Sequence, residues 1–254
     1  MRHFENHSKE ASKAFKLNGF INIPNIFNDD EIDNIIKATD RYIDEIVPYR
    51  PAKEIFYEDD GNPDSLKQIQ VMHQHDAFFK DLIEGKLKKL AEIVLGEPAE
   101  PVNLQYFNKP PGGQATPPHQ DGYYFKLKPN HAVTMWLALE DVDKENGYVS
   151  YVQGSHRYGL RHHGKSGVLG FSQHMLDFGQ PHDINNLVSF PASAGDLLAH
   201  HSLTIHKAEG NSSENRTRRV LGFIYYAKSS KIDEATIKTY KEQLELEKRI
   251  GKEQ

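Results

Sequence analysis

The chain has 254 residues, a formal net charge of −5 at pH 7 and no cysteine, so disulfides, thiolate metal sites and cysteine nucleophiles are excluded. The charge lacks the basic excess of a nucleic-acid-binding protein, and no stretch approaches the ~18 consecutive apolar residues of a membrane span. The N-terminus also lacks the apolar core of a secretory signal. We therefore expect a soluble, cytoplasmic protein with a single domain over residues 1–254 and with neither nucleic acid nor a membrane as partner.

The first part of the chain, residues 1–97, has mainly helical patterns. Asn28 can cap a helix that starts next to it, and Glu31 stands at the position of a capping box. The following isoleucines share one face at helical spacing: Ile32, Ile35, Ile36, Ile43 and Ile46. A second helical pattern over residues 78–96 ends at Gly96, a residue suited to a helix C-terminus.

Residues 98–226 have a different texture, because short apolar or alternating runs are separated by Gly, Pro and Asn. Many short strands with turn signals between them are typical of a β-sandwich or barrel. The charged segment 232–250 predicts a C-terminal helix. The sequence thus predicts a helical N-terminal part on an antiparallel β-core, with a small-ligand site inside the core.

Histidines and carboxylates are the strong metal ligands left to a chain without cysteine. In a strand, residues two apart point to the same face, so His119 and Asp121 of the triplet His119-Gln120-Asp121 can reach one metal. A distant histidine would complete the two-His, one-carboxylate set of non-haem Fe(II) oxygenases. The triplet alone carries little information, because a chain with 14 histidines is expected to contain one by chance.

The surroundings of the triplet carry the information. KPPGGQATPPHQDGYY is followed by TMWLALEDVDKENGYVSYVQGSH and later by PASAGDLLAHHSLTIHKAEGNSSENRTRRVLGFIYY. These blocks, in this order over about residues 103–226, resemble the phytanoyl-CoA dioxygenase family. The resemblance implies a double-stranded β-helix of the jelly-roll or cupin-like kind, mainly β with flanking helices. It also implies Fe(II) and the co-substrates 2-oxoglutarate and O₂, with His119, Asp121 and His206 as metal ligands.

The same resemblance assigns the residues around the co-substrate. Arg218 matches the arginine that pairs with the distal carboxylate of 2-oxoglutarate, a pairing suited to a bidentate guanidinium. The loop before it is one residue longer than usual, so Arg216 and Arg219 stay open as alternatives. Trp136 matches a tryptophan beside the co-substrate, and Asn103 and Gln105 match positions that often contact it. The chain departs from the family where His206 is followed by Lys207 in place of glycine.

The substrate is less well defined by the sequence. Tyr123 and Tyr124 follow the triplet and are candidates for the wall of a substrate pocket or for core packing. The basic segment 156–165 contains Arg157 and Arg161, which are either solvated or bind an anionic group. The resemblance implies hydroxylation with release of succinate and CO₂. We expect a small, anionic metabolite such as a phosphonate, carboxylate or acyl derivative, and no oligomeric state is predicted.

Two alternatives remain at this stage. One is a cupin-type metal enzyme that does not use 2-oxoglutarate, and the other is a non-catalytic binding module on the same fold; a role for Arg218 in 2-oxoglutarate binding separates the first from the oxygenase. His73 and His75 imitate the metal-binding spacing, but they lie outside the β-core blocks, so we interpret them as surface or capping residues. His200 competes with His206 as a ligand, but only His206 precedes the Asn211 and arginine run.

Overall fold

The computed structural model describes residues 2–59, 62–168, 171–235 and 237. The helices are α1 (Arg2–Asn18), α2 (Asp29–Arg41), α3 (Ala77–Glu84), α4 (Lys86–Leu95), α5 (Gly122–Phe125) and α6 (Pro181–Asn185), and α2 continues as a π-helical turn at Tyr42–Ile46. The strands are β1 (Phe20–Ile23), β2 (Ile55–Tyr57), β3 (Leu66–Ile69), β4 (Ala99–Asn108), β5 (Thr116–His119), β6 (Leu127–Lys128), β7 (Ala132–Ala138), β8 (Val149–Val152), β9 (His163–Val168), β10 (Phe171–Met175), β11 (Leu187–Phe190), β12 (Leu197–His201), β13 (His206–Ala208), β14 (Arg219–Ala227) and β15 (Lys231–Ile232).

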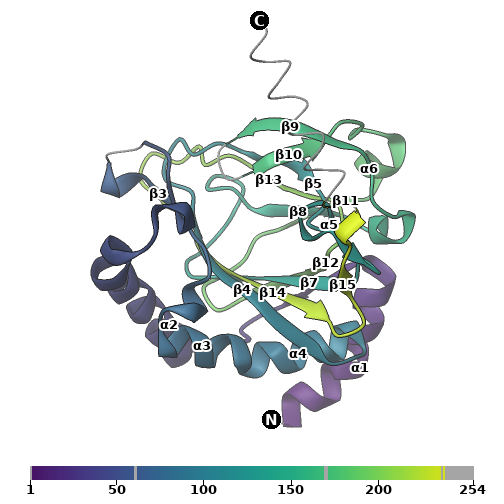
Figure 1. The fold of residues 1–254 in the computed structure, drawn as a ribbon, viewed down its shortest axis with the longest axis horizontal. Coiled ribbons are helices and arrows are strands. Elements are labelled where there is room, and N and C mark those ends of the chain that lie inside the picture. Colours follow the sequence, from purple (N-terminus) through teal and green to yellow (C-terminus); the bar gives the residue numbers. More distant parts are fainter. Residues whose placement is uncertain (1, 60–61, 169–170, 236, 238–254) are drawn as a thin grey trace, which may run out of the picture.

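Two antiparallel sheets form the centre of the fold (Figure 1). The major sheet has seven strands in the order β1-β12-β7-β14-β4-β3-β2, and the minor sheet has four in the order β11-β8-β13-β5. The hairpin β9–β10 and a two-stranded sheet of β6 and β15 contain the remaining strands of the described residues. The prediction of a mainly β fold with flanking helices is confirmed, and the two sheets have the layout of a double-stranded β-helix.

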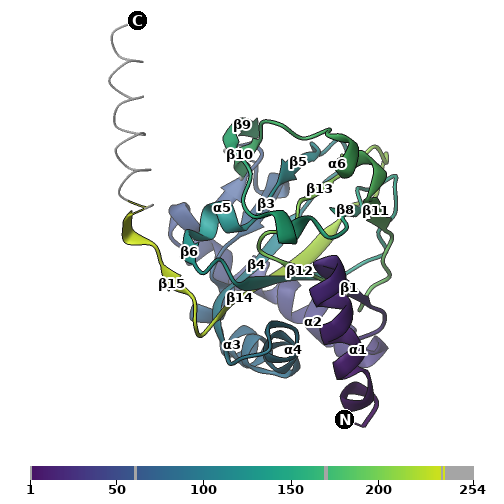
Figure 2. The same cartoon turned by 90° about the vertical axis from the view of Figure 1, so that its right-hand side faces the viewer.

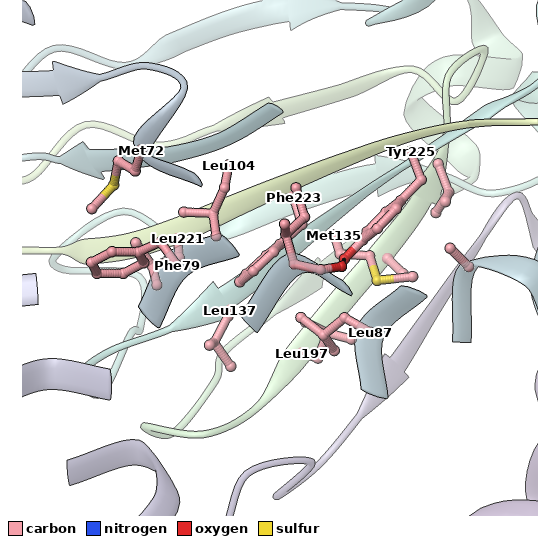
Figure 3. Packing of buried hydrophobic residues seen from close by; sticks show 14 of the residues in the cluster. Met72, Phe79, Leu87, Leu104, Met135, Leu137, Leu197, Leu221, Phe223 and Tyr225 are labelled. Atoms are coloured by element: carbon pink, nitrogen blue, oxygen red, sulfur yellow. Dashed lines mark hydrogen bonds between the residues drawn. The ribbon is translucent and has the colours of Figure 1, made fainter. Parts of the chain in front are cut away.

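Helices α1 to α4 cover the outer face of the major sheet, while the minor sheet lies against its other face (Figures 1 and 2). The core between helices and sheet follows from alternation along each strand, since successive side chains point to opposite faces. On β7, Val133, Met135 and Leu137 point to the helices, whereas Trp136 and Ala138 belong to a second cluster with residues of the minor sheet. Figure 3 shows this outer core, in which Phe223 and Leu87 are both fully buried.

The N-terminal helices follow their sequence signals in part. Asn28 caps α2 with the predicted capping box, because its side chain accepts from the Glu31 amide and the Glu31 carboxylate accepts from the Asn28 amide. Gly96 ends α4 in the left-handed conformation, with φ +75°. The helix predicted over residues 78–96 is wrong in one respect: it is divided into α3 and α4 at Gly85.

The prediction that residues 1–97 are simply helical needs a further correction. The strands β1, β2 and β3 lie in this part and extend both edges of the major sheet, where β1 pairs with β12 and β3 pairs with β4. These strands are three or four residues long, so they are too short to show a period in the sequence. The helix predicted over 232–250 lies almost entirely outside the described residues, and Ile232 itself ends β15.

Candidate metal centre

His119 and His206 come together because their strands pair. In the antiparallel register of β5 and β13, His206 lies directly opposite His119, and the centres of the two rings are 4.1 Å apart. The Nδ1 of His119 lies 2.8 Å from the carbonyl oxygen of Pro117, and the Nδ1 of His206 lies 3.0 Å from that of Thr204. A carbonyl only accepts, so we assign the ring proton of each to Nδ1. Each Nε2 therefore presents a lone pair, the form in which histidine binds a metal.

Asp121 joins this pair through a turn. The sequence argument placed His119 and Asp121 on one strand, but β5 ends at His119 and Asp121 has helical dihedrals (φ −56°, ψ −33°) at the start of α5. The carboxylate Oδ1 lies 3.7 Å from the Nε2 of His119 and 3.7 Å from the Nε2 of His206. One ligand atom from each of the three residues therefore lies within 4.8 Å of the other two.

Gln120, between the two, holds the turn in place. Its side chain is fully buried and donates to the carbonyl oxygens of Gly159 (2.9 Å) and Leu203 (2.7 Å), while its Oε1 accepts from the amide of Arg161 (2.8 Å). The middle residue of the triplet thus points away from the centre and ties it to two loops, which fixes the direction of its neighbours.

The electrostatics of the centre suit a cation. Burial lowers the pKa of His119 and, together with the neighbouring His119 and His200, lowers that of His206 well below its usual value, so both rings are neutral near pH 7. Burial alone would raise the pKa of Asp121, but His206, His200 and His119 hold it well below its usual range. Two neutral imidazoles and one carboxylate, with one ligand atom each within 4.8 Å of the other two, are the donor set of mononuclear non-haem Fe(II) sites, which leave coordination positions open.

The second oxygen of Asp121 is occupied by protein groups. Oδ2 accepts from Thr134 Oγ1 (2.5 Å) and lies 3.0 Å from His200 Nε2. The sequence left His200 open as a ligand in place of His206, and the structure instead puts it behind Asp121, outside the group of converging ligand atoms.

A cavity of about 290 Å³ opens from the three residues between the two sheets. Its wall contains inward-facing residues of the major sheet (Asn103, Gln105, Thr134, Trp136) and of the minor sheet (Thr116, Val149, Tyr151, Ala208), together with Arg218. The structure thus brings four residues that the sequence assigned to the co-substrate into one cavity with the metal-ligand candidates: Trp136, Asn103, Gln105 and Arg218.

Arg218 differs from the two neighbouring arginines in its surroundings. It is 6% exposed, its guanidinium lies 5.5 Å from the ring centre of Trp136, and its Nε is buried without a hydrogen-bond partner among the described residues. Burial lowers its pKa to about 10, so it stays charged at neutral pH. A buried, charged donor of this kind calls for an anion.

Arg216 and Arg219 are engaged elsewhere. Arg216 pairs with Asp143 (2.7 Å) and Glu145 (3.2 Å) near the surface, and Arg219 pairs with Asp40 (2.8 Å) and Glu140 (3.3 Å). Neither lines the cavity. Of the three candidates that the sequence left open, only Arg218 faces it.

Asn103 and Gln105 belong to a polar network on the cavity wall. The Oδ1 of Asn103 accepts from the amide of Val71 (2.9 Å), a β-branched residue with φ +49°. The Oε1 of Gln105 accepts from the Nε2 of Gln68 (3.1 Å) on β3. Asn103 thus stabilises a strained turn in addition to lining the cavity, and Gln68 is a wall residue that the sequence did not single out.

The two tyrosines after the triplet have different positions. Tyr124 lines the cavity, and its hydroxyl donates to the carbonyl oxygen of Gln173 on β10 (2.8 Å). Tyr123 lies outside the cavity wall and stacks on His163, with ring centres 4.5 Å apart. Tyr124 therefore stays a candidate for substrate contact, whereas Tyr123 has a packing role against His163.

The basic segment 156–165 does not reach the cavity. Arg157 is exposed, and Arg161 is neutralised by Asp177 (3.1 Å) and Asp183 (2.7 Å), so the structure does not bring the two arginines to the site as the anion-binding hypothesis required.

Three lysines line the cavity instead. Lys67 pairs with Glu58 (2.7 Å) and Lys207 with Glu209 (2.7 Å), whereas the buried Nζ of Lys109 donates to the carbonyl oxygen of Glu209 (2.6 Å) and has no carboxylate partner among the residues that the structure describes. Burial, followed by the charges of Arg218 and Lys67, lowers the pKa of Lys109 to about 6. Arg218 is thus the charged side chain of the wall that no carboxylate balances among the described residues, whereas Lys109 is mostly neutral at pH 7.

The sequence argument did not identify the roles of three residues near the site, although two of them carried a usable signal. Thr134 is two residues before Trp136 in an alternating run, so it shares the inner face of the sheet; His200 alternates with the inward-facing Leu198 in the same way. Gln68 gave no comparable signal. His73 and His75 lie outside the centre: the Nδ1 of His73 accepts from the Leu104 amide (3.3 Å), and His75 lies 3.6 Å from Glu54.

Comparison with known proteins agrees with this geometry. The family model described as phytanoyl-CoA dioxygenase (PhyH) matches residues 15–220. A phytanoyl-CoA dioxygenase domain-containing protein 1 homolog of Caenorhabditis elegans is 24% identical over 250 residues, covering 81% of this chain and 86% of the relative.

Two solved structures share the fold at lower identity. The epimerase SnoN, in complex with Fe³⁺, alpha ketoglutarate and nogalamycin RO, superposes with a TM-score of 0.72 at 22% identity, covering 89% of this chain and 86% of that one. EctD from S. alaskensis, with 2-oxoglutarate and 5-hydroxyectoine, gives a TM-score of 0.73 at 19% identity, covering 88% and 77%. The double-stranded β-helix expected from the sequence is confirmed by this likeness. Among the described residues, no helix is long and apolar enough to cross a membrane.

Proposed function

The chain belongs to the phytanoyl-CoA dioxygenase family, and from this premise we propose that it is an Fe(II)- and 2-oxoglutarate-dependent dioxygenase that hydroxylates a small, anionic metabolite. The observation that carries the proposal is one cavity with two features. Three ligand atoms of His119, Asp121 and His206 converge at its wall, and the buried Arg218 faces it with no anionic partner in the part of the chain that the structure describes.

The residues present fit the metal and the co-substrate. The two Nε2 atoms and the Asp121 Oδ1 would hold Fe(II), and Arg218 would receive the distal carboxylate of 2-oxoglutarate through its guanidinium. When bound, the iron and 2-oxoglutarate supply the oxidising chemistry, with succinate and CO₂ as co-products. The chain's own part is to orient the co-substrate between Trp136 and the polar wall of Asn103 and Gln105, and to keep bulk water from the cavity.

The substrate class rests on the size and charge of the cavity. Its volume of about 290 Å³ is at the lower end of the range for ligand sites, roughly 300–1,000 Å³, and the co-substrate takes part of it. Lys109 lies beside Arg218 and has no carboxylate partner among the described residues; its pKa of about 6 leaves it mostly neutral at pH 7, and an anion bound next to it would favour its protonated form. These two properties favour a small phosphonate, carboxylate or other anion as the substrate, because a long acyl chain would not fit entirely into the cavity.

The lack of cysteines supports the cytoplasm as the proposed compartment of the protein.

The test has a binding arm and a turnover arm. Anaerobic addition of Fe(II) and 2-oxoglutarate should give a visible charge-transfer band, which His119→Ala and Asp121→Ala abolish. His75→Ala is the matched control, because His75 belongs to the similar His73-x-His75 pair outside the cavity, and it should keep the band. A band that survives both alanine variants at the centre refutes the metal assignment.

The turnover arm measures succinate release with a panel of small anionic metabolites, amino acids and acyl-CoAs. Mass spectrometry of the organic product distinguishes hydroxylation, which adds one oxygen atom, from an isomerisation of the kind named for the epimerase SnoN, which does not change the mass. An iron-loaded, folded protein that binds 2-oxoglutarate but releases succinate with no member of the panel would contradict the proposed hydroxylation of a small anion.

A further inference from the structure

The Asp121 oxygen that faces away from His119 and His206, Oδ2, has hydrogen-bond partners of its own. We propose that Thr134, Tyr151 and His200 form a clamp that holds Asp121 as a one-oxygen ligand and so keeps a metal position open. This inference rests on the proposed function, since it assigns positioning residues to the proposed metal centre.

Two donors of the clamp come from neighbouring strands of the major sheet. Thr134 on β7 and His200 on β12 are direct partners in the strand register, so their side chains stand next to each other on the inner face. Both reach the same oxygen of Asp121, Thr134 Oγ1 at 2.5 Å and His200 Nε2 at 3.0 Å. The other oxygen, Oδ1, is left facing the two ligand imidazoles.

The third member sets the tautomer of His200. A carboxylate only accepts, so His200 Nε2 must carry a proton to bond Asp121, and the neutral ring then accepts at Nδ1. The Tyr151 hydroxyl lies 3.1 Å from that Nδ1 and donates to it. Tyr151 is fully buried on β8, where it is the strand partner of His206, so the chain of hydrogen bonds links the minor sheet to the major one.

The same rule explains why neighbouring histidines have different roles. The rings of His200 and His206 are 4.2 Å apart, yet a carbonyl faces the Nδ1 of His206 and a hydroxyl faces the Nδ1 of His200. His206 therefore presents a lone pair at Nε2, whereas His200 presents a proton there. His200 is a positioning residue for Asp121 and not an alternative ligand.

The clamp would keep one coordination position of the metal free of Asp121. A carboxylate that is free to turn can bind a metal through both oxygens, and it would then occupy a site that the co-substrate needs. Two donors on Oδ2 oppose that rotation and hold Oδ1 in place. Groups that orient a ligand in this way typically change metal affinity or activity 10- to 100-fold when they are removed.

Co(II) is the probe for the test, because it is stable in air and its visible spectrum reports coordination number. Titration calorimetry and absorption spectra are recorded for the wild type, Thr134→Val, Thr134→Ser and His200→Leu. We expect about 10- to 100-fold weaker Co(II) binding and an altered spectrum for the valine and leucine variants. Thr134→Ser keeps a hydroxyl donor and should retain the wild-type affinity and spectrum.

His201→Leu is the matched control, because His201 follows His200 on β12 but contacts His131 and Phe15 on the other face of the sheet. Wild-type affinity in this variant supports the clamp. Equal weakening by His201→Leu, or unchanged affinity and spectrum in Thr134→Val, overturns it, and Thr134→Val decides the matter if His200→Leu does not fold. If the wild-type protein does not bind Co(II), the proposed metal centre is refuted together with the clamp. If the wild type binds Co(II) and Thr134→Val binds it equally well, only the clamp is refuted.

Discussion

Replacing Arg218 with methionine is expected to weaken co-substrate binding without destabilising the free protein. The side chain is 6% exposed and faces the cavity, and its Nε has no hydrogen-bond partner among the described residues. Methionine has a similar length and can keep the contact with Trp136, but it has no charge and no donors. A purely structural arginine would instead be engaged in the free protein, and its loss would destabilise the fold.

The magnitude for binding follows from the loss of a buried, charged pair. Removal of one partner of such a pair typically costs about 2–5 kcal/mol. At about 1.36 kcal/mol for each factor of ten, this corresponds to roughly 30- to 5,000-fold weaker binding of 2-oxoglutarate.

The same substitution is not expected to lower the stability of the free protein. A buried donor without a partner costs about 1–3 kcal/mol in the free protein, and methionine removes that cost while it loses part of the stacking on Trp136. The melting temperature of the free protein should therefore stay the same or rise, by about 2–4 °C for each kcal/mol gained.

Calorimetric titration of the Co(II)-loaded protein with 2-oxoglutarate, and thermal unfolding without it, measure the two effects. Arg216→Met is the control, because Arg216 pairs with Asp143 and Glu145 at the surface and should leave 2-oxoglutarate binding unchanged. The reasoning is refuted if Arg218→Met binds 2-oxoglutarate as the wild type does, or if it lowers the melting temperature while Arg216→Met does not.

Three further predictions concern the fold and the metal. Phe223→Ala, in the outer core of Figure 3, should lose about 3–5 kcal/mol in urea unfolding, whereas Tyr49→Ala, at a position 87% exposed, should stay within about 0.5 kcal/mol. Burial, with the neighbouring charges of His131 and His156, lowers the pKa of His201 from 6.5 to about 3. Below pH 6.5 the unfolded chain therefore binds a proton that the folded chain does not bind, and the free energy of unfolding falls as the pH falls from 6.5 toward 3. His201→Leu should reduce this acid-dependent loss, by at most about 1.4 kcal/mol per pH unit, in unfolding measured at pH 7 and pH 5; an equal loss in both proteins contradicts the assignment. Co(II) at about 100 times its Kd should stabilise the protein by about 2.7 kcal/mol, a chelator should reverse the effect, and a similar gain in His119→Ala would contradict it.

Some features of the chain are determined by neighbours in the sequence, and these could be predicted. Asn28 and Glu31 cap α2 because their bonds close within one turn, and Gly96 ends α4 because the left-handed conformation suits glycine locally. The order of the blocks around His119, Asp121 and His206 identified the converging residues, although the reason given for the first two was wrong, because Asp121 lies on a turn beyond the strand.

Other features depend on partners that are distant in the chain. The edge strands β1 and β3 exist because strands more than thirty residues away pair with them: β1 pairs with β12, β3 pairs with β4, and β2 is added to the sheet through β3. Which of the three arginines at positions 216, 218 and 219 faces the cavity depends on where the carboxylates of Asp40, Glu140 and Asp143 lie. Proximity in the sequence carries no information on such pairings.

The sequence by itself therefore determined the class of fold, the helix ends at Asn28 and Gly96 and the set of metal-ligand candidates, because these rest on local hydrogen bonds and on residue types in a fixed order. Only the tertiary structure decided which groups surround each side chain. The carbonyl opposite one imidazole and the hydroxyl opposite its neighbour set their protons, and with them the separate roles of His206 and His200. The carbonyl belongs to Thr204, two residues before His206, whereas the hydroxyl belongs to Tyr151 of the other sheet and reaches His200 only after the two sheets have packed.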